Sequence, residues 1–336
     1  MTTLTIKERI RGIFLGTGVG DALGMAVETF SPDKIKEKYG VDRVTDYLLP
    51  TGHKWFDGRK AGTTTDDTSL TIAVTEGLIE GGFNMDIQVE KHIEAYKIST
   101  SGWGGTTKTA IRNLINGTHW QASGMRYGKY GRGNGVTMKI APVVAYMRGL
   151  VEKSPDQKSK ILGEGFAFIR NLTLMTHRTQ MAVCASVAYC VALYKCLDPN
   201  LDINLLPGYI LSFANTAKKW YDGEETDDIV KRFALLKKHN QYDSTRIMEE
   251  FGGGSCYCYN SVPFTMMFFL NGPRDINTLY DVVSCGADSD TNGAMLGAML
   301  GALNGEGIFP RHLIDGLDGK DCILETADRL CDAIVV

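Results

Sequence analysis

The apolar residues of this chain recur mostly at spacings of three and four, which is the period of an amphipathic helix. Near the start, Ile6, Ile10, Ile13 and Phe14 fall on one helical face. The same period marks residues 85–98, 107–115, 143–151, 160–174, 181–197 and 279–283. Alternating apolar and polar runs, which are typical of strands, are nearly absent. The pattern therefore predicts an all-α protein.

Two polar connections, residues 151–160 and 218–243, interrupt the helical pattern, and the second is the most charged part of the chain. Apolar helical segments lie on both sides of each connection, so neither is typical of a linker between domains. No internal repeat is present. We predict one domain over residues 1–336 that brings the two ends of the chain together.

Small residues are concentrated in two segments. Gly16, Gly18 and Gly20 lead into the sequence DALG at 21–24, where missing side chains let a backbone or a ligand come close. That segment is either tightly packed or part of a site. Glycines and alanines at 293–302 form a smooth helical face, which in a short helix indicates close packing in the core.

Composition narrows the functional class. Hydrophobic residues make up 43% and charged residues 22%, as in a globular enzyme, and the net charge of −3 disfavours direct nucleic-acid binding. The charged first residues do not resemble a signal peptide, and the longest apolar stretches fall short of the roughly 20 residues of a membrane helix. Eight cysteines without a Cys-x-x-Cys pair indicate free thiols in a reducing cytoplasm.

Two oxygen-rich clusters are the strongest candidates for chemistry. They are TDDT at 65–68 and DSDT at 288–291, and each opens an apolar helix within small-residue sequence. Carboxylate and hydroxyl oxygens suit magnesium, manganese or calcium, whereas zinc would call for His or Cys. Each cluster alone is also explained as a helix cap. The sequence ETDD at 225–228 has the same composition in a charged stretch, and we interpret it as a cap.

The two oxygen-rich clusters differ from simple caps in the free energy that burying their carboxylates together would cost. Several carboxylates at buried helix starts repel one another unless a cation neutralises them. The two clusters together therefore favour a metal site.

A glycine loop and a histidine are weaker candidates. The sequence GRGNG at 131–135 exposes backbone amides that can hold a phosphate, although its spacing does not match a dinucleotide fingerprint. His177 is expected to open the long apolar helix that begins at Met181. A lone histidine is more often structural than catalytic, but beside the glycine loop it would be able to contact an adenine or a phosphate.

Taken together, these segments resemble the ADP-ribosylglycohydrolase family over nearly the whole chain. The matching motifs occupy residues 16–28, 65–68, 133–142, 176–177, 261–263 and 286–291. The resemblance implies a single compact orthogonal helical bundle with a central cleft. It also implies two Mg²⁺ ions in that cleft, with Mn²⁺ as a possible substitute.

The resemblance further implies roles for individual residues. The metal ligands are expected to be Thr65, Asp66, Asp67, Asp288, Asp290 and Thr291. The residues expected to bind ADP-ribose are Gly133, Asn134, Gly135 and His177. Glu28 or Asp67 is expected to take a proton from water, with Asp67 preferred, and the sequence does not choose between them. Relatives often carry Arg where this chain has Lys139, a change expected to alter a contact near the glycine loop.

The implied activity is magnesium-dependent hydrolysis of the bond between ADP-ribose and a modified target, foremost ADP-ribosyl-arginine on a protein. The alternatives are a serine-linked, poly-ADP-ribose or small-metabolite substrate, or a catalytically silent, crystallin-like protein that binds ADP-ribose. We expect a cytoplasmic monomer whose partner is an ADP-ribosylated protein or a small ADP-ribosyl substrate, away from membranes.

Overall fold

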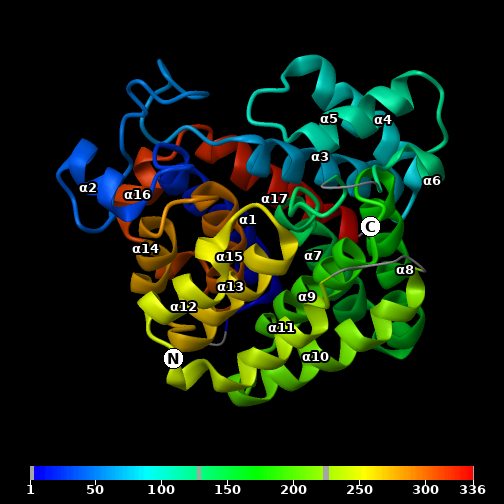
Figure 1. Ribbon diagram of the computed structural model, residues 1–336. Coiled ribbons are helices and arrows are strands. Elements are labelled where there is room, and N and C mark those ends of the chain that lie inside the picture. Colours follow the sequence, from blue (N-terminus) through cyan, green and yellow to red (C-terminus); the bar gives the residue numbers. More distant parts are fainter. Residues whose placement is uncertain (1–3, 127–129, 222–226, 336) are drawn as a thin grey trace.

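Two helices from opposite ends of the chain lie side by side at the centre of the molecule, α1 (Ile6–Met25) and α15 (Ser289–Asn304) (Figure 1). They run antiparallel, and their glycines face one another at three levels: Gly12 with Gly301, Gly16 with Gly297, and Gly20 with Gly293. A Cβ atom on any of these glycines would overlap the facing backbone. The segment 293–302 is thus closely packed, as predicted, and of the two alternatives left open for residues 16–24 close packing applies to its glycines.

The computed structural model describes residues 4–126, 130–221 and 227–335. Over these residues the regular structure is α-helix and short 3₁₀ turns, and the only β-type pairings are two isolated bridges. The prediction of an all-α protein is confirmed.

Most predicted helices are present with small differences at their ends. The segment 85–98 coincides with α4 (Met85–Ile98), and 143–151 lies within α7 (Ala141–Lys153). The other helices around the central pair are α2 (Pro32–Tyr39), α3 (Asp66–Gly81), α5 (Gly105–Ile115), α6 (Trp120–Ser123), α8 (Lys158–Thr176), α9 (Gln180–Cys196), α10 (Leu206–Ala217), α11 (Ile229–Ala234), α12 (Ser244–Glu250), α13 (Cys258–Asn271), α14 (Asn277–Ser284), α16 (Arg311–Gly316) and α17 (Lys320–Val335).

The core surrounds the central pair. Helices α9, α13 and α15 are buried on nearly every side, which matches their almost uniformly apolar sequences. The eight cysteines are free thiols, as expected. No helix in the described part of the chain combines the length and apolar character that crossing a membrane requires.

Candidate functional site

The first acidic cluster lies at the start of α3, as predicted. Thr65 is the N-cap residue, and its hydroxyl accepts a hydrogen bond from the Asp67 amide. The carboxylate of Asp21, from α1, accepts from the amides of Thr65 and Thr68 and from the Thr68 hydroxyl at 2.6 Å. Since Thr65 and Asp21 satisfy the first amides of α3, the side chains of Asp66 and Asp67 are not needed as caps.

The second cluster lies at the start of α15, but its first carboxylate does not cap the helix. Asp288 occupies the N-cap position and makes no side-chain cap bond. Instead, the Asn134 side-chain amide donates to Asp288 and, at 2.8 Å, to the Ser261 hydroxyl. Asp288 is therefore oriented by the glycine loop, and the capping explanation does not account for it.

The two clusters meet. One oxygen from each of Asp21, Asp67 and Asp290 lies within 4.8 Å of the others, and the same holds for Glu28, Asp288 and Asp290. We call Asp21, Glu28, Asp66, Asp67, Asp288 and Asp290 the acidic cluster. The Thr291 hydroxyl lies 3.3 Å from Asp67 Oδ2 and joins the two helix starts.

The donor set matches a hard divalent cation. Asp67 Oδ1 is buried and has no hydrogen-bond partner in the described part of the chain, an arrangement that is costly unless a cation occupies the position. Neither triad of carboxylates includes a histidine or a cysteine. Oxygen ligands of this kind favour Mg²⁺, Mn²⁺ or Ca²⁺ over zinc.

Burial raises the pKa of every carboxyl group in the acidic cluster, because it penalises the charged form. The pKa rises to about 6 for Asp21 and Asp288 and to about 7 for Asp66, and it is raised strongly for Glu28, Asp67 and Asp290. For the last three, repulsion from neighbouring carboxylates adds to burial. A bound cation would reverse these shifts by stabilising the ionised forms.

The turn that carries Glu28 is joined to the turn before Asp288. The Thr29 amide donates to the Ala287 carbonyl, and the Ala287 amide donates to the Phe30 carbonyl at 2.9 Å. Thr29 (φ 66°) and Ala287 (φ 53°) are the two non-glycine residues of the described chain with left-handed backbone. Such conformations cost free energy and persist where the surrounding structure holds them.

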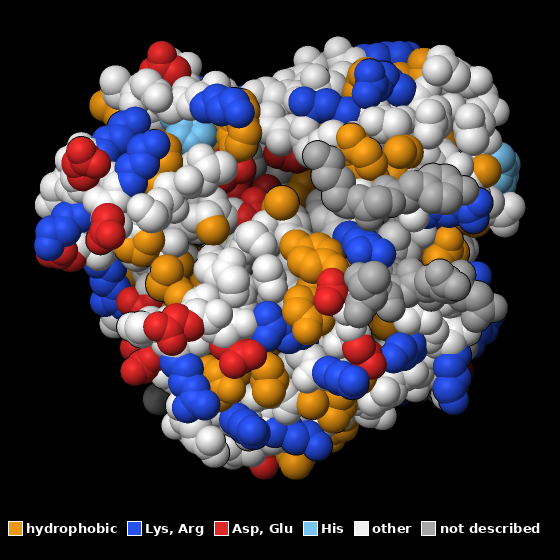
Figure 2. All heavy atoms as spheres, viewed as in Figure 1, with side chains coloured by type: hydrophobic (Ala, Val, Ile, Leu, Met, Phe, Trp, Pro, Cys, Tyr) orange, Lys and Arg blue, Asp and Glu red, His pale blue; other side chains and the backbone are white. Residues whose placement is uncertain are grey.

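Five members of the acidic cluster, all but Asp21, line a cavity of about 540 Å³, and Figure 2 shows acidic side chains at the bottom of a hollow in the surface. All four residues expected to bind ADP-ribose line this cavity: Gly133, Asn134, Gly135 and His177. The structure thus brings together the metal-ligand and substrate-binding candidates.

His177 differs from expectation in its place along the chain. It follows the last residue of α8, and α9 begins at Gln180, so His177 ends one helix and does not open the next. Burial lowers its pKa to about 3, and Nδ1 lies 2.8 Å from the Thr176 hydroxyl. The ring is therefore neutral at ordinary pH and suits a contact role better than proton transfer.

The glycine loop is less open than its sequence indicates. The Asn134 backbone amide donates to the Cys256 carbonyl at 3.0 Å and is not available to a phosphate.

Lys139 is also placed differently from expectation. Its ammonium group is fully buried 3.1 Å from His92 Nε2, away from the lining of the cavity, and burial lowers its pKa to about 7.

Sequence reasoning missed two parts of the site. Asp21 was noticed only within a glycine-rich segment, although an aspartate inside a small, buried helical stretch is itself a signal because its burial is costly. The start of α5 also lines the cavity, and its N-cap, Gly104, provides no side-chain cap. No side chain in the described part of the chain caps the amides there, so they can face an anion, and the run Gly102-Trp103-Gly104-Gly105 was the signal in the sequence.

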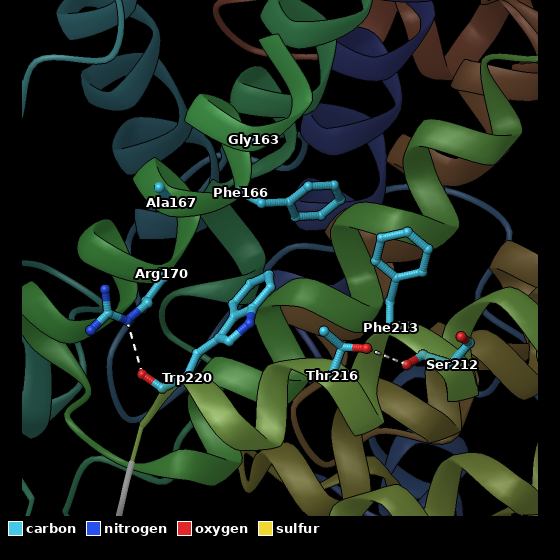
Figure 3. Close-up of a pocket in the computed structure, with 8 residues that line it drawn as sticks. All are labelled: Gly163, Phe166, Ala167, Arg170, Ser212, Phe213, Thr216 and Trp220. Carbon is cyan, nitrogen blue, oxygen red and sulfur yellow. Dashed lines mark hydrogen bonds between the residues drawn. The ribbon is translucent and has the colours of Figure 1, made fainter. Parts of the chain in front are cut away.

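A second cavity, of about 740 Å³, lies between α8 and α10 (Figure 3). Its wall contains the rings of Phe166, Phe213 and Trp220, and Arg170 Nε donates to the Trp220 carbonyl at 3.0 Å. The described residues that line it include no carboxylate. It therefore lacks the groups that the acidic cavity offers for hydrolysis.

Comparison with known proteins decides the family, since residues 2–336 match the family profile described as ADP-ribosylglycohydrolase. The chain belongs to the ADP-ribosylglycohydrolase family. It is 24% identical to ADP-ribosyl-[dinitrogen reductase] glycohydrolase of Rhodospirillum rubrum, with 95% of this chain and 94% of that protein covered. It is 22% identical to human ADP-ribosylhydrolase ARH3, with 96% and 93% covered.

A solved structure described as an ADP-ribosylglycohydrolase-related protein complex has a TM-score of 0.69 and 23% identity, and 98% of each chain is covered. This likeness confirms the predicted fold. Membership of the ADP-ribosylglycohydrolase family confirms that the chain is a hydrolase that acts on ADP-ribosylated substrates.

Proposed function

We propose that this ADP-ribosylglycohydrolase cleaves the bond between ADP-ribose and an arginine side chain of a modified protein, and that it requires Mg²⁺, with Mn²⁺ as a substitute. The observation that carries the proposal is the convergence of the acidic cluster at the floor of the cavity lined by His177 and the glycine loop. A guanidinium leaving group is positively charged, and the carboxylates of this cavity attract it.

Two sets of carboxylates are proposed to hold two cations. Asp21, Asp67 and Asp290 offer one set, and Glu28, Asp288 and Asp290 offer the other. Thr65, Asp66 and Thr291 complete the predicted ligands around them. Two bound dications would offset only part of the charge of the six carboxylates, orient the ribose hydroxyls and make the attacking water more acidic.

Glu28 is proposed to take the proton from that water. It lies in the turn after α1, is only partly buried and lines the cavity, whereas Asp67 is almost fully buried and already accepts from the hydroxyls of Thr65 and Thr291. Water attacks the anomeric carbon of the ribose, the bond from that carbon to the guanidine nitrogen breaks, and the departing nitrogen gains a proton. The products are ADP-ribose and arginine.

The other end of the cavity is proposed to hold the diphosphate and adenosine. The first turn of α5 presents uncapped amides at the positive end of a helix, which favours an anion. Gly133 and Gly135 leave room beside the neutral His177 ring, because a Cβ on Gly135 would lie 3.3 Å from His177 Cε1. Substitution of Gly135 by alanine therefore reduces the space for substrate.

The test is the release of free ADP-ribose from arginine-linked, serine-linked and polymeric substrates, with Mg²⁺ and with chelator. We expect arginine-linked peptide to be cleaved fastest, chelator to stop turnover and Mg²⁺ to restore it. Glu28→Gln should lose turnover and still bind ADP-ribose. Faster cleavage of serine-linked or polymeric substrate would overturn the linkage, and ADP-ribose binding without any turnover would indicate a silent relative.

A further inference from the structure

We propose that Trp55 contacts the leaving group of the substrate and favours a planar, positively charged one, the guanidinium of arginine. This inference rests on the proposed function and adds the residue that selects the linkage. Trp55 lines the cavity together with Glu28 and Asp66, and 45% of its surface is exposed. A large ring held at the mouth of a polar cavity is placed to contact what enters it.

The position of Trp55 is fixed by its neighbour in the 52–59 loop. His53 is 3% exposed, its Nε2 lies 3.0 Å from the Glu28 carbonyl oxygen, and its Nδ1 accepts from the Trp55 amide. These two bonds assign the proton to Nε2. The His53 ring also stacks on Phe56, with centroids 4.9 Å apart. Trp55 and Glu28 are therefore held by the same side chain, on the same side of the cavity.

The other end of the 52–59 loop is attached to a different part of the cavity wall. The Arg59 guanidinium donates to the Thr64 carbonyl at 2.9 Å and to the Ser101 hydroxyl at 2.8 Å. Thr64 directly precedes the TDDT sequence at 65–68, and Ser101 precedes the segment that leads into α5. Because both ends of the loop are hydrogen-bonded to segments that contribute to the cavity, the loop is part of the site.

The chemistry of the indole ring indicates which leaving group it prefers. The face of Trp attracts cations more strongly than that of other aromatic residues. A cation already lies over this ring, since Lys54 Nζ is 5.2 Å from its centroid, and the exposed Lys54 side chain is free to be replaced by a bound guanidinium. The hydroxyl of a serine leaving group is neutral and has no flat face. Trp55 therefore favours arginine over serine.

The test compares two linkages in one pair of variants. Trp55→Ala should lower kcat/KM for an ADP-ribosyl-arginine peptide about tenfold, a cation–π contribution, and change that for an ADP-ribosyl-serine peptide by less than about twofold. Trp55→Phe retains a ring and should lose less than about threefold on the arginine peptide. Leu49→Ala is the control, because Leu49 lies six residues earlier in the sequence, is 59% exposed and does not line the cavity.

A binding measurement decides the role of Trp55 independently of turnover. In the Glu28→Gln background, Trp55→Ala should weaken ADP-ribosyl-arginine about tenfold and leave ADP-ribose, which lacks the leaving group, within about twofold. If wild type cleaves none of the substrates, the proposed function fails while this difference still tests Trp55. Equal losses for both ligands, or no loss for either, would overturn the inference.

Discussion

The start of α11 and the helix starts of the acidic cluster have nearly the same composition, but the pKa values of their carboxyl groups shift in opposite directions. At α11, the Asp228 side chain accepts from the Val230 amide, and Lys218 Nζ lies 2.9 Å away. Burial alone would raise the pKa of Asp228, but the hydrogen bond and charge of Lys218 lower it. In the acidic cluster, burial dominates and every pKa is raised.

The difference teaches that partners, and not residue type, separate a cap from a metal site. Asp228 has an amide and an ammonium group to satisfy it, and Asp227 accepts from the Tyr257 hydroxyl at 2.8 Å. Glu225 and Thr226 of the same motif lie outside the described residues. The interpretation of Asp228 as a cap is confirmed. In the acidic cluster, by contrast, no basic side chain of the described residues is bonded to a carboxylate.

The largest expected difference is in turnover. Asp290→Asn should lower the release of ADP-ribose at least about a thousandfold, because Asp290 belongs to both groups of carboxylates and its loss removes several kcal/mol of transition-state stabilisation. Asp67→Asn should do the same. Asp228→Asn should retain turnover within about twofold. A strong loss in Asp228→Asn, or near-normal turnover in Asp290→Asn, would mean that the wrong acidic motif was chosen.

The second expected difference is a reversal of stability with metal. In chelator, Asp290→Asn should be more stable than wild type by about 1 kcal/mol or more of unfolding free energy, since one repulsive carboxylate is gone. It should therefore unfold at a higher temperature. In saturating Mg²⁺ the order should invert, because only wild type gains binding free energy. Thermal melts under both conditions measure this. Wild type above the variant by one constant margin would exclude a shared metal site.

The third expected difference is the sign of the pH dependence in chelator. The pKa of Asp66 is raised in the folded state to about 7, so its contribution to stability is present below about pH 4 and is lost as pH rises toward 7. The pKa of Asp228 is lowered, so its contribution is present at neutral pH and is lost in acid. Urea unfolding at several pH values gives the unfolding free energy of wild type minus that of each variant. This difference should fall with rising pH for Asp66→Asn and rise with pH for Asp228→Asn.

The smallest expected effect concerns the cap alone. Asp228→Asn retains a good N-cap and loses a half-exposed ion pair, so it should cost less than about 1 kcal/mol of unfolding free energy. Asp228→Ala removes the cap as well and should cost about 1 kcal/mol more. Urea unfolding at neutral pH separates the two variants. Equal costs would show that the capping bond contributes nothing measurable.

Local patterns predicted the helices well because caps and apolar spacing act over a few residues. Thr65 was correctly placed before α3, and the apolar face of 85–98 gave both ends of α4. Several helices were not predicted, α10 and α17 among them. Helix α13 was missed because Pro263 lies inside it and its apolar residues do not define one face. Fully buried helices have no polar face from which to read a period.

The sequence predicted the site residues that lie within a short motif, but not those that depend on contacts between distant parts of the chain. Asp21 joins the cluster because α1 packs closely against α15. The glycines of each segment indicated close packing, but no local pattern identified the partner helix at the other end of the chain. The role of Asn134 likewise depends on Asp288, which lies 154 residues away along the chain. His177 was assigned to the wrong helix end because the three residues between α8 and α9 interrupt the helix without a glycine or a proline.

The glycines along α1 and α15 recur every four residues, so sliding α15 by four residues, about 6 Å, would bring the next glycines face to face. The same slide would carry Asp290 away from Asp21. The glycines thus allow close approach without specifying register. Register is fixed by directional hydrogen bonds. At one end of the pair Arg9 donates to the carbonyls of Ala302 and Leu303, and at the other the Thr29 amide donates to the Ala287 carbonyl between two left-handed residues. Hydrogen bonds made by two strained residues thus help to keep the acidic oxygens of separate helices in alignment.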